Sequence, residues 1–336
     1  MKLRVGLFGC GRIASHFHAP ILSQLPDVEL TALVDIDPEN RGRLVHLAPG
    51  AMQYSDWRRA LEIGALDAAV ICLPPALHAP VACAAFDASC AVYVEKPLAL
   101  SLEDGRSMIR RWRQSGKTGM VGFNFRFHPH YLQAVGMLRS GHLGEVCAVR
   151  SVMTSAKRAL PGWKAKKNSG GDALLDLAIH HVDIIGFLTD SRWQVDSLHS
   201  VSTQKDCGSV AILSGALETG APVSVTVAQT TSTSTHRIEL LCERGHLHID
   251  LADAGVPPLQ GGSKLSPRLA RLLARLAAVT PRELLHNPYR EPSFRIALEA
   301  FVSAARENKQ TSPDLEDGFE ALEVVLMAVK GRTLQK

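Results

Sequence analysis

The apolar positions of residues 1–122 fall into short continuous runs that alternate with longer amphipathic segments. Runs in which neighbouring residues are all apolar are typical of strands buried on both faces, as in parallel sheets. They lie at residues 3–8, 28–34, 68–73 and 91–94. Segments with the 3.6-residue period of a helix follow them at residues 12–25, 38–47, 76–86 and 102–115. The alternation predicts an α/β domain with a doubly wound parallel sheet and right-handed crossovers.

From residue 144 the pattern changes to a series of strand-like runs with few helical segments between them. The runs lie at residues 145–154, 193–203, 209–217, 223–231, 237–242 and 246–251. Short turns at residues 218–222 and 243–245 are typical of hairpins, so neighbouring strands are expected to be antiparallel. Helix-period segments lie at residues 172–188, 293–307 and 315–330. We therefore predict a second, α+β domain, an open and mainly antiparallel sheet flanked by helices, and place the two domains at residues 1–122 and 123–336.

Composition and charge are those of a globular protein and exclude several classes of partner. Of the 336 residues, 46% are apolar and 21% are charged, and 37 Lys and Arg stand against 33 Asp and Glu. Without a basic run, nucleic-acid binding is not expected, and no apolar stretch reaches the ~18 residues of a membrane span. The first apolar run breaks at residue 9 with no cleavage site after it, so a cytoplasmic location is expected. The seven cysteines form no CxxC pair and are expected to be small buried side chains.

Residues 253–288 differ from the rest of the second half. Residues 255–267 are rich in Gly, Pro and Ser and are expected to form a loop. Residues 268–276 place leucines on one helical face and arginines on another. This pattern predicts a short helix that covers the domain surface or an oligomer contact, with attachment to a membrane surface as the alternative.

A glycine-rich turn directly follows the first predicted strand and opens the first predicted helix. Its sequence is Gly9-Cys10-Gly11-Arg12-Ile13-Ala14. Gly9 permits a tight turn, Gly11 lets the backbone approach a pyrophosphate, and the small Ala14 lets helix and strand pack closely. The free N–H groups and the dipole of the helix N-terminus then face the phosphates. A GxGxxA pattern alone is weak, but the strand–turn–helix context predicts a Rossmann domain that binds a nicotinamide dinucleotide.

Asp35 ends the second predicted strand. A carboxylate at this position accepts hydrogen bonds from the adenosine ribose hydroxyls and repels a 2′-phosphate, which favours NAD over NADP. Arg41 and Arg43 follow closely in the sequence, so NADP stays the less favoured alternative.

Three further motifs carry candidate chemistry. Val94-Glu95-Lys96-Pro97 ends a buried strand, at the edge where open α/β sheets bind their ligands. Asp176 and His180 lie in a predicted helix after Gly170-Gly171, and their separation of four residues places both side chains on one face. Gly122-Phe123-Asn124-Phe125-Arg126-Phe127-His128-Pro129 lies where the two predicted domains join. Structural interpretations stand beside these: a solvated strand end at Lys96, and a hydrogen bond on a helix surface at Asp176 and His180.

Together the motifs resemble those of the Gfo/Idh/MocA oxidoreductases, the family of glucose–fructose oxidoreductase and inositol dehydrogenase. The resemblance covers essentially the whole length. It rests on the order and spacing of Gly9–Ala14, Leu73-Pro74-Pro75-Ala76-Leu77-His78, Glu95-Lys96-Pro97, Asn124-Phe125-Arg126-Phe127 and the Gly-Gly helix with Asp176 and His180. It implies NAD(P) in the Rossmann domain, a sugar or cyclitol between that domain and the open sheet, and Lys96, Asp176 and His180 as the catalytic group.

These residue types suit the oxidation of a secondary alcohol to a ketone, in which a hydride leaves for the nicotinamide and a proton leaves for a base. His180 is the natural base because imidazole titrates near neutral pH. Asp176 would orient the imidazole and stabilise its charged form. Lys96 would donate a hydrogen bond to the reacting oxygen and stabilise the negative charge that develops there.

The resemblance also implies which other residues line the ligands. Expected cofactor contacts, beyond the glycine turn and Asp35, are Cys72, Leu73, Pro74, His78, Glu95, Lys96, Asn124, Trp163, Lys164 and Tyr289. Expected substrate contacts, beside the catalytic group, are Arg126, His128, Lys157 and Arg158. Lys164 departs from the family's commoner Arg, which loses a bidentate fork but keeps the charge. Asp172 replaces a frequent third glycine and is expected either to cap the helix or to alter a substrate contact.

No metal is expected. His181 and Asp183 have the chemistry of metal ligands, but the family needs no metal and the neighbouring His180 has a use as a base. The pairs His16/His18 and His246/His248 have HxH spacing without supporting carboxylates in the sequence, so they are expected to be surface or core histidines.

The function expected from these observations is NAD(P)-dependent interconversion of a secondary hydroxyl and a ketone on a sugar, nucleotide sugar or cyclitol. Two alternatives stay open. One is a glycosidase or eliminase that oxidises its substrate transiently with retained NAD, and the other is a non-catalytic regulator that binds the dinucleotide. A homodimer or homotetramer through the exposed face of the open sheet is also expected.

Overall fold

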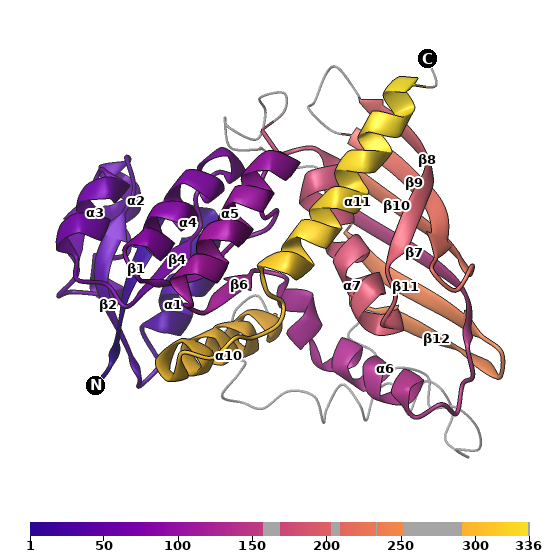
Figure 1. Cartoon of the computed structure of the whole chain (residues 1–336), viewed down its shortest axis with the longest axis horizontal. Helices are drawn as coiled ribbons and strands as arrows, with labels where there is room; N and C mark the ends of the chain where they lie inside the picture. The colour runs from indigo at the N-terminus through magenta and orange to yellow at the C-terminus, as the bar shows by residue number, and fades with distance from the viewer. Residues whose placement is uncertain (157–168, 203–208, 233, 252–290, 335–336) are drawn as a thin grey trace. The chain divides into compact units, whose positions relative to one another are not determined.

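The structure is a computed structural model that describes residues 1–156, 169–202, 209–232, 234–251 and 291–334 (Figure 1). The chain forms two compact units, and each unit contains several segments of the sequence. The first comprises Met1–Asn124, Gly162–Gly171 and Phe294–Glu323, and the second comprises Phe125–Pro161, Asp172–Ser293 and Val324–Lys336. The domain division at residues 122/123 stays a prediction.

The first unit is built on a sheet of six parallel strands in the order β3-β2-β1-β4-β5-β6. The strands are β1 (Leu3–Phe8), β2 (Val28–Val34), β3 (Met52–Tyr54), β4 (Ala68–Ile71), β5 (Ala91–Val94) and β6 (Gly119–Val121). Every residue of β4 and β5 is buried, so these strands are apolar without alternation. The predicted doubly wound parallel sheet is confirmed. The order reverses between β1 and β4, and their carboxyl ends therefore flank the crevice where such sheets bind ligands.

Helical segments connect these strands. They are η1 (Ala14–His18), α1 (Ala19–Leu22), α2 (Pro38–Gly42), η2 (Val45–Leu47), α3 (Trp57–Ile63), η3 (Pro75–Leu77), α4 (His78–Asp87) and α5 (Leu102–Ser115). The segment η1 is a π-helical turn, a wider turn than that of an α-helix, and such turns are frequent at functional sites. The longest of these helices, α5, begins where the Ser101 hydroxyl accepts the Asp104 N–H at 3.1 Å and ends at Gly116, whose φ is 62°.

Two C-terminal helices, α10 (Ser293–Glu307) and α11 (Leu315–Leu334), contribute to the first unit. The Phe301 ring of α10 is fully buried and lies 5.6 Å from the Tyr93 ring, centre to centre. The N–H of Val121 in β6 donates to the Pro313 carbonyl at 3.0 Å, which satisfies part of the free edge of that strand. The C-terminal segment therefore closes one side of the Rossmann sheet.

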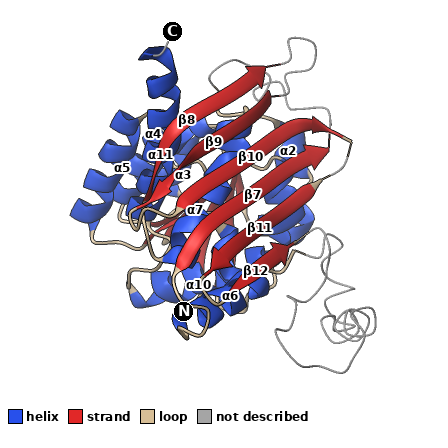
Figure 2. Cartoon of the chain, turned by 90° about the vertical axis from the view of Figure 1, so that its right-hand side faces the viewer, coloured by secondary structure: helices blue, strands red, loops and turns tan. Residues whose placement is uncertain are grey.

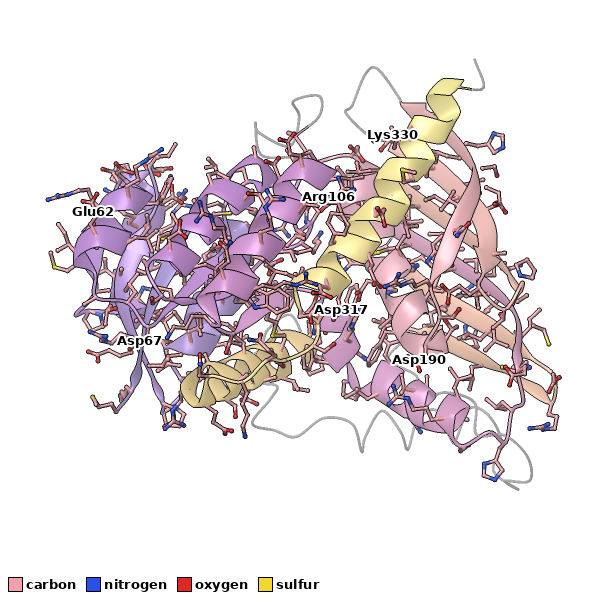
Figure 3. All side chains as sticks on the ribbon, viewed as in Figure 1. Glu62, Asp67, Arg106, Asp190, Asp317 and Lys330 are labelled. Atoms are coloured by element: carbon pink, nitrogen blue, oxygen red, sulfur yellow. The ribbon has the colours of Figure 1, made fainter. Side chains whose placement is uncertain are left out.

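The beginning of α11 packs on α5. A Cβ on Gly105 would lie 2.8 Å from the Phe319 ring, so glycine is what allows this close approach. The guanidinium carbon of Arg106 lies 5.4 Å from the centre of the same ring, and Figure 3 labels Arg106 on α5 and Asp317 on α11. The packing joins two helices that are far apart in the sequence.

The second unit contains a six-stranded sheet in the order β12-β11-β7-β10-β9-β8 (Figure 2). The strands are β7 (Val146–Ala156), β8 (Trp193–Ser202), β9 (Ser209–Leu217), β10 (Pro222–Thr231), β11 (Thr235–Cys242) and β12 (Gly245–Asp250). Only β7 and β10 pair in parallel among these strands, so the predicted mainly antiparallel sheet is confirmed. Side chains alternate between a buried and a more exposed face, as in β11, where Ile238 and Leu240 are buried.

Helices of the second unit cover one face of this sheet, seen behind the strands in Figure 2. They are α6 (Pro129–Arg139), η5 (Leu174–Ala178), which is a second π-helical turn, and α7 (Ile179–Thr189). The sequence pattern did not predict α6, which buries only Tyr131, Ala134 and Val135 and therefore has a weak apolar stripe.

Burial of the cysteines agrees with expectation only in part. Cys10 and Cys90 are buried and Cys72, Cys83 and Cys242 are half-buried. The expectation is wrong for Cys147, which is exposed: the register of β7 with β11 shifts between Ala148 and Val146, so Cys147 has no position opposite it on β11. None of the described helices is long and apolar enough to cross a membrane. Cys207 and the segment at residues 255–276 lie outside the described residues.

Candidate functional site

The glycine turn begins with a backbone conformation that only glycine adopts without strain. Gly9 follows β1 with a φ of 92°, and a Cβ there would lie 2.7 Å from the carbonyl carbon and oxygen of Cys72. The N–H of Cys72 donates to the Phe8 carbonyl at 2.6 Å. The ends of β1 and β4 are therefore in direct contact at this point.

Gly11 meets a different requirement. A Cβ on Gly11 would have no heavy atom of the described residues within 4 Å, so the space beside it is open. Ala14, at the third position of the motif, is fully buried. The turn thus combines a close internal contact at Gly9 with room at Gly11, which fits the approach of a pyrophosphate to the start of the helix.

Asp35 lies beside this turn at the end of β2. Its carboxylate accepts the Cys10 N–H at 2.8 Å and the Asp37 N–H at 2.9 Å. A guanidinium nitrogen of Arg41 donates to the main-chain carbonyl of Asp35. Burial and the Asp35 charge raise the pKa of the Cys10 thiol to about 12, so Cys10 can act here through its N–H group rather than as a thiolate.

Glu95 and Lys96 follow β5 at the same edge of the sheet. The Glu95 N–H donates to the Ile71 carbonyl at 2.9 Å, which continues the pairing of β5 with β4. The Glu95 carboxylate is buried and lies 2.6 Å from Nε2 of His18, while Lys96 is half-buried. The Lys96–Pro97 peptide bond is cis. The predicted cofactor contact Asn124 is buried at the start of η4 (Asn124–Phe127), just after β6.

His78 holds two loops of this edge together. Its Nδ1 lies 2.8 Å from the Pro97 carbonyl, and its Nε2 lies 2.8 Å from the Leu73 carbonyl. Burial lowers the pKa of His78, while the two carbonyls and the Glu95 charge act in the opposite direction. The expected cofactor residues Cys72, Leu73 and Pro74, on the loop after β4, are half-buried.

Asp176 and His180 lie on consecutive helical segments of the second unit. Asp176 belongs to η5 and His180 to the first turn of α7, and both are buried, with 9% and 7% of their surface exposed. Nε2 of Gln229, in β10, donates to Oδ2 of Asp176 at 3.3 Å. The His180 ring lies 4.6 Å from the Phe125 ring, centre to centre. A hydrogen bond between Asp176 and His180 stays a prediction.

Asp172 begins η5. Its carboxylate accepts the N–H groups of Leu174 at 2.9 Å and Leu175 at 3.1 Å, so the expected capping role is confirmed. The negative charge also lies at the positive end of the helix dipole.

Arg126 and Asp183 form a buried ion pair within the second unit. Nε of Arg126 lies 3.0 Å from both carboxylate oxygens, and its Nη2 lies 2.6 Å from Oδ1. The side chains of Arg126 and Asp183 are 11% and 1% exposed. Asp183 therefore has a cation as its partner, and a substrate contact of Arg126, which stays a prediction, would have to share its guanidinium with this carboxylate.

Buried aromatic side chains from α6, α7 and β11 lie next to Phe125, the ring that contacts His180. The Tyr131 hydroxyl lies 2.9 Å from Nε2 of His236, and the His236 ring lies 4.7 Å from the His181 ring. Burial lowers the pKa of His181 to about 3 and is the main cause that lowers the pKa of His236. His128, an expected substrate contact, caps α6 by accepting the His130 N–H at 3.2 Å.

The two HxH pairs need a correction. His16 and His246 are exposed and His18 is buried, as surface or core histidines are. Each pair nevertheless has a carboxylate neighbour, one from a distant part of the sequence and one from the neighbouring strand of a hairpin. His18 lies beside Glu95, and Nδ1 of His248 lies 3.3 Å from Glu239. Sequence spacing missed both carboxylates because strand pairing and helix packing bring them in.

Gln229 had a detectable signal in the sequence. Val223, Val225 and Val227 occupy the buried face of β10, and the period of two places Gln229 on that same face. A polar side chain in a buried register needs a polar partner, which Asp176 supplies. Five predicted site residues, Lys157, Arg158, Trp163, Lys164 and Tyr289, lie outside the described residues.

Substitutions at the two glycines of the turn should separate folding from binding. Gly9→Ala should lower the thermal midpoint, because the new Cβ meets the Cys72 backbone in a disfavoured conformation. Gly11→Ala should leave the midpoint unchanged and weaken NAD binding by at least about tenfold, since it fills the space a pyrophosphate needs. Thermal unfolding and calorimetric titration measure the two effects. Undiminished NAD affinity in Gly11→Ala would contradict this assignment of the turn.

The stability of the second unit should fall with acid through His181. Its pKa of about 3 in the folded chain lies below the ordinary value near 6.5, so the unfolded chain binds the proton first. The contribution is complete above pH 6.5 and is lost as the pH falls toward 3. Between pH 7 and pH 5, the free energy of unfolding of the wild type should fall by about 2 kcal/mol more than that of His181→Phe, as measured by denaturant titration. The exposed control His246→Phe should lose as much stability as the wild type. Equal pH dependence of all three proteins would refute the prediction.

Comparison with protein families and curated relatives agrees with the geometry. Residues 3–123 match the oxidoreductase family with an NAD-binding Rossmann fold, and residues 131–248 match the Gfo/Idh/MocA C-terminal domain. D-glucoside 3-dehydrogenase of Escherichia coli K12 is 30% identical over 213 residues, which are 61% of this chain and only 60% of that enzyme's length. Inositol 2-dehydrogenase of Rhizobium meliloti is 26% identical over 339 residues, 98% of this chain and 97% of that enzyme.

Solved structures show the same fold. An oxidoreductase domain protein from Kribbella flavida has a TM-score of 0.82 at 24% identity, covering 100% of this chain and 98% of that one. The WlbA dehydrogenase from Bordetella pertussis, in complex with NADH and UDP-GlcNAcA, has a TM-score of 0.81 at 22% identity, with 100% and 96% covered. The family matches in both halves, on a chain with this dinucleotide turn and sheet order, show that it belongs to the Gfo/Idh/MocA family of NAD-binding oxidoreductases.

Proposed function

We propose that this protein is an NAD-dependent dehydrogenase or ketoreductase that interconverts a secondary hydroxyl and a ketone on a sugar, nucleotide sugar or cyclitol. The observation that carries the proposal is the buried pair Asp176 and His180 on one helix, in a chain that also has Lys96 at the ligand-binding edge of its Rossmann sheet. A protein that only bound the dinucleotide would have no use for a buried acid and a buried base four residues apart. Relatives named D-glucoside 3-dehydrogenase and inositol 2-dehydrogenase support this class of substrate.

The roles of the residues follow from their chemistry. His180 takes the hydroxyl proton, and the carboxylate of Asp176 orients the imidazole and stabilises it once charged. Gln229 holds that carboxylate in place through its 3.3 Å hydrogen bond. Lys96 donates to the substrate oxygen and stabilises the negative charge that develops there. When bound, NAD supplies the hydride acceptor, so the alcohol loses a hydride and a proton and becomes a ketone.

The preference for NAD rests on Asp35. Its carboxylate is fixed beside the glycine turn by the N–H groups of Cys10 and Asp37. In that position a second negative charge, the 2′-phosphate of NADP, would be repelled. Arg41 makes its hydrogen bond to the Asp35 carbonyl, which holds the acid in place rather than neutralising its carboxylate.

We also propose a homodimer or homotetramer formed through the more exposed face of the second sheet. Cross-strand ion pairs line that face, with Arg237 2.8 Å from Asp250 and Arg150 3.2 Å from Glu239. Exposed apolar side chains, among them Val201, Ile212 and Leu241, lie on the same sheet. The molar mass from light scattering decides the matter, and a monomer at micromolar concentration would contradict it.

His180→Ala should abolish hydride transfer and leave NAD affinity nearly unchanged, because it removes the base and no expected cofactor contact. General-base removal costs roughly 10² to 10⁴ in rate. Stopped-flow absorbance at the NADH band measures the rate, and calorimetry measures the affinity. Turnover at the wild-type rate in this variant would refute the role given to His180.

The substrate class is tested by following NADH formation across inositols, hexoses, aminosugars and UDP-sugars, with NAD and NADP in parallel. We expect turnover with at least one of these polyols and a higher kcat/KM with NAD. A higher value with NADP would refute the cofactor choice. Glycosidic cleavage by protein that retains NAD, without net NADH, would indicate the transient-oxidation class instead. NAD binding with no reaction on any polyol would indicate a regulator.

A further inference from the structure

Two buried histidines flank the segment Glu95-Lys96-Pro97, one on each side of Lys96. His18 contacts the Glu95 side chain, and His78 contacts the Pro97 carbonyl. Both histidines are buried, with 0% and 1% of their surface exposed, and all of these residues belong to the first unit. The half-buried Lys96 lies between two fixed neighbours.

On the first side, His18 is fixed by its packing. It ends the π-helical turn η1, which starts at Ala14 of the dinucleotide motif. Its ring meets the rings of Tyr93 and Phe294 edge-on, at centre-to-centre distances of 5.4 and 5.8 Å. The 2.6 Å contact from its Nε2 to Oε1 of Glu95 is a short hydrogen bond between buried groups, which water does not weaken. This hydrogen bond therefore ties the Glu95 side chain to the helical turn that follows the glycine turn.

On the second side, His78 begins α4 and spans two loops. Nδ1 contacts the carbonyl of Pro97, directly after Lys96, and Nε2 contacts the carbonyl of Leu73, after β4. Both ring nitrogens lie at hydrogen-bond distance from main-chain carbonyls, which only accept, so a neutral ring donates to one of them and a charged ring donates to both. The sequence predicts His78 as a cofactor contact, but its polar atoms are used within the protein.

A lysine needs such support because its side chain has many conformations. Lysine loses much rotamer entropy when it is ordered, and a donor has to be aimed to within a fraction of an ångström to be effective. Fixing the residues before and after Lys96 restricts its backbone, which sets the origin and direction of the side chain.

We propose that His18 and His78 are positioning residues that hold Lys96 in its working orientation, His18 through the Glu95 side chain and His78 through the Pro97 carbonyl. The proposal rests on the proposed function, because it takes Lys96 as the donor to the substrate oxygen. It goes beyond it by giving two histidines a role in catalysis without contact to substrate. Both histidines come from segments that border the dinucleotide turn. The same segments therefore position the cofactor-binding turn and the Lys96 side chain.

The two histidines use different ring nitrogens, which permits a crossed test. The amide nitrogen of Gln lies near the place of a histidine Nε2, and that of Asn lies near the place of Nδ1. His18 acts through Nε2, so His18→Gln should preserve the contact and His18→Asn should lose it. His78 holds Pro97 through Nδ1, so His78→Asn should preserve that contact and His78→Gln should lose it. Gln should therefore be the better replacement at residue 18, and Asn the better replacement at residue 78.

The first readout needs no substrate. The lysines are labelled by reductive ¹³C-methylation, and the Lys96 signal is assigned with Lys96→Arg. We expect His18→Asn and His78→Gln to narrow this signal and move it toward those of exposed lysines. The signal in His18→Gln, His78→Asn and the exposed control His46→Gln should match that of the wild type.

The second readout is turnover on the best polyol. His18→Asn and His78→Gln should lose about 10²-fold in kcat, the effect of misplacing a catalytic group by about an ångström. KM and NAD affinity should change far less.

The proposal would be overturned if the same residue, Asn or Gln, preserved the Lys96 signal better at both positions. A Lys96 signal that is unchanged in all four variants would also overturn it. A variant that does not fold counts as having lost its contact, and the signal of the other variant at that position decides. If no polyol is oxidised, the proposed function fails, while the Lys96 signal still tests whether His18 and His78 position Lys96.

Discussion

The ligand edge of the first unit depends on one close backbone approach, that of Gly9 to the carbonyl group of Cys72. It brings the ends of β1 and β4 together where the strand order reverses, and it requires the positive φ of Gly9. The start of η1 follows from this turn, so the helix N-terminus, the Cys10 N–H and the buried His18 take their positions from it. A side chain at residue 9 would therefore displace groups well beyond the turn itself.

The second unit buries polar side chains where its helices pack against its sheet, and several of them form pairs. Asp176 accepts a hydrogen bond from Gln229, Asp183 pairs with the Arg126 guanidinium, and the Tyr131 hydroxyl contacts the His236 ring nitrogen. In a low-dielectric interior each of these pairs is strong when complete and costly when one partner is removed. The three pairs join η5 to β10, α7 to η4 and α6 to β11, so the helical segments before and along His180 are tied to their neighbours.

The sequence predicted what depends on local pattern. The central strands of the first sheet are buried on both faces and therefore appear as continuous apolar runs, whereas β3 and β6 are too short to show one. Gly9, Gly11 and Asp35 were predictable because each is required at a fixed place in a strand–turn–helix unit. The His18–Glu95 contact joins residues 77 apart, and the Arg126–Asp183 pair joins residues 57 apart. No local spacing encodes such contacts, and only the packing of distant elements creates them.

The last described segment of the chain also completes the first unit, and this has a consequence for synthesis. A ribosome releases the Rossmann strands first, yet Phe17 is covered by Phe294 and Tyr93 by Phe301, which emerge far later. Until then the nascent sheet carries apolar surface and the open edge of β6. Folding of the first unit is thus finished only after residues 294–301 have been synthesised. A chain cut short before residue 294 leaves its N-terminal unit a substrate for chaperones and proteases.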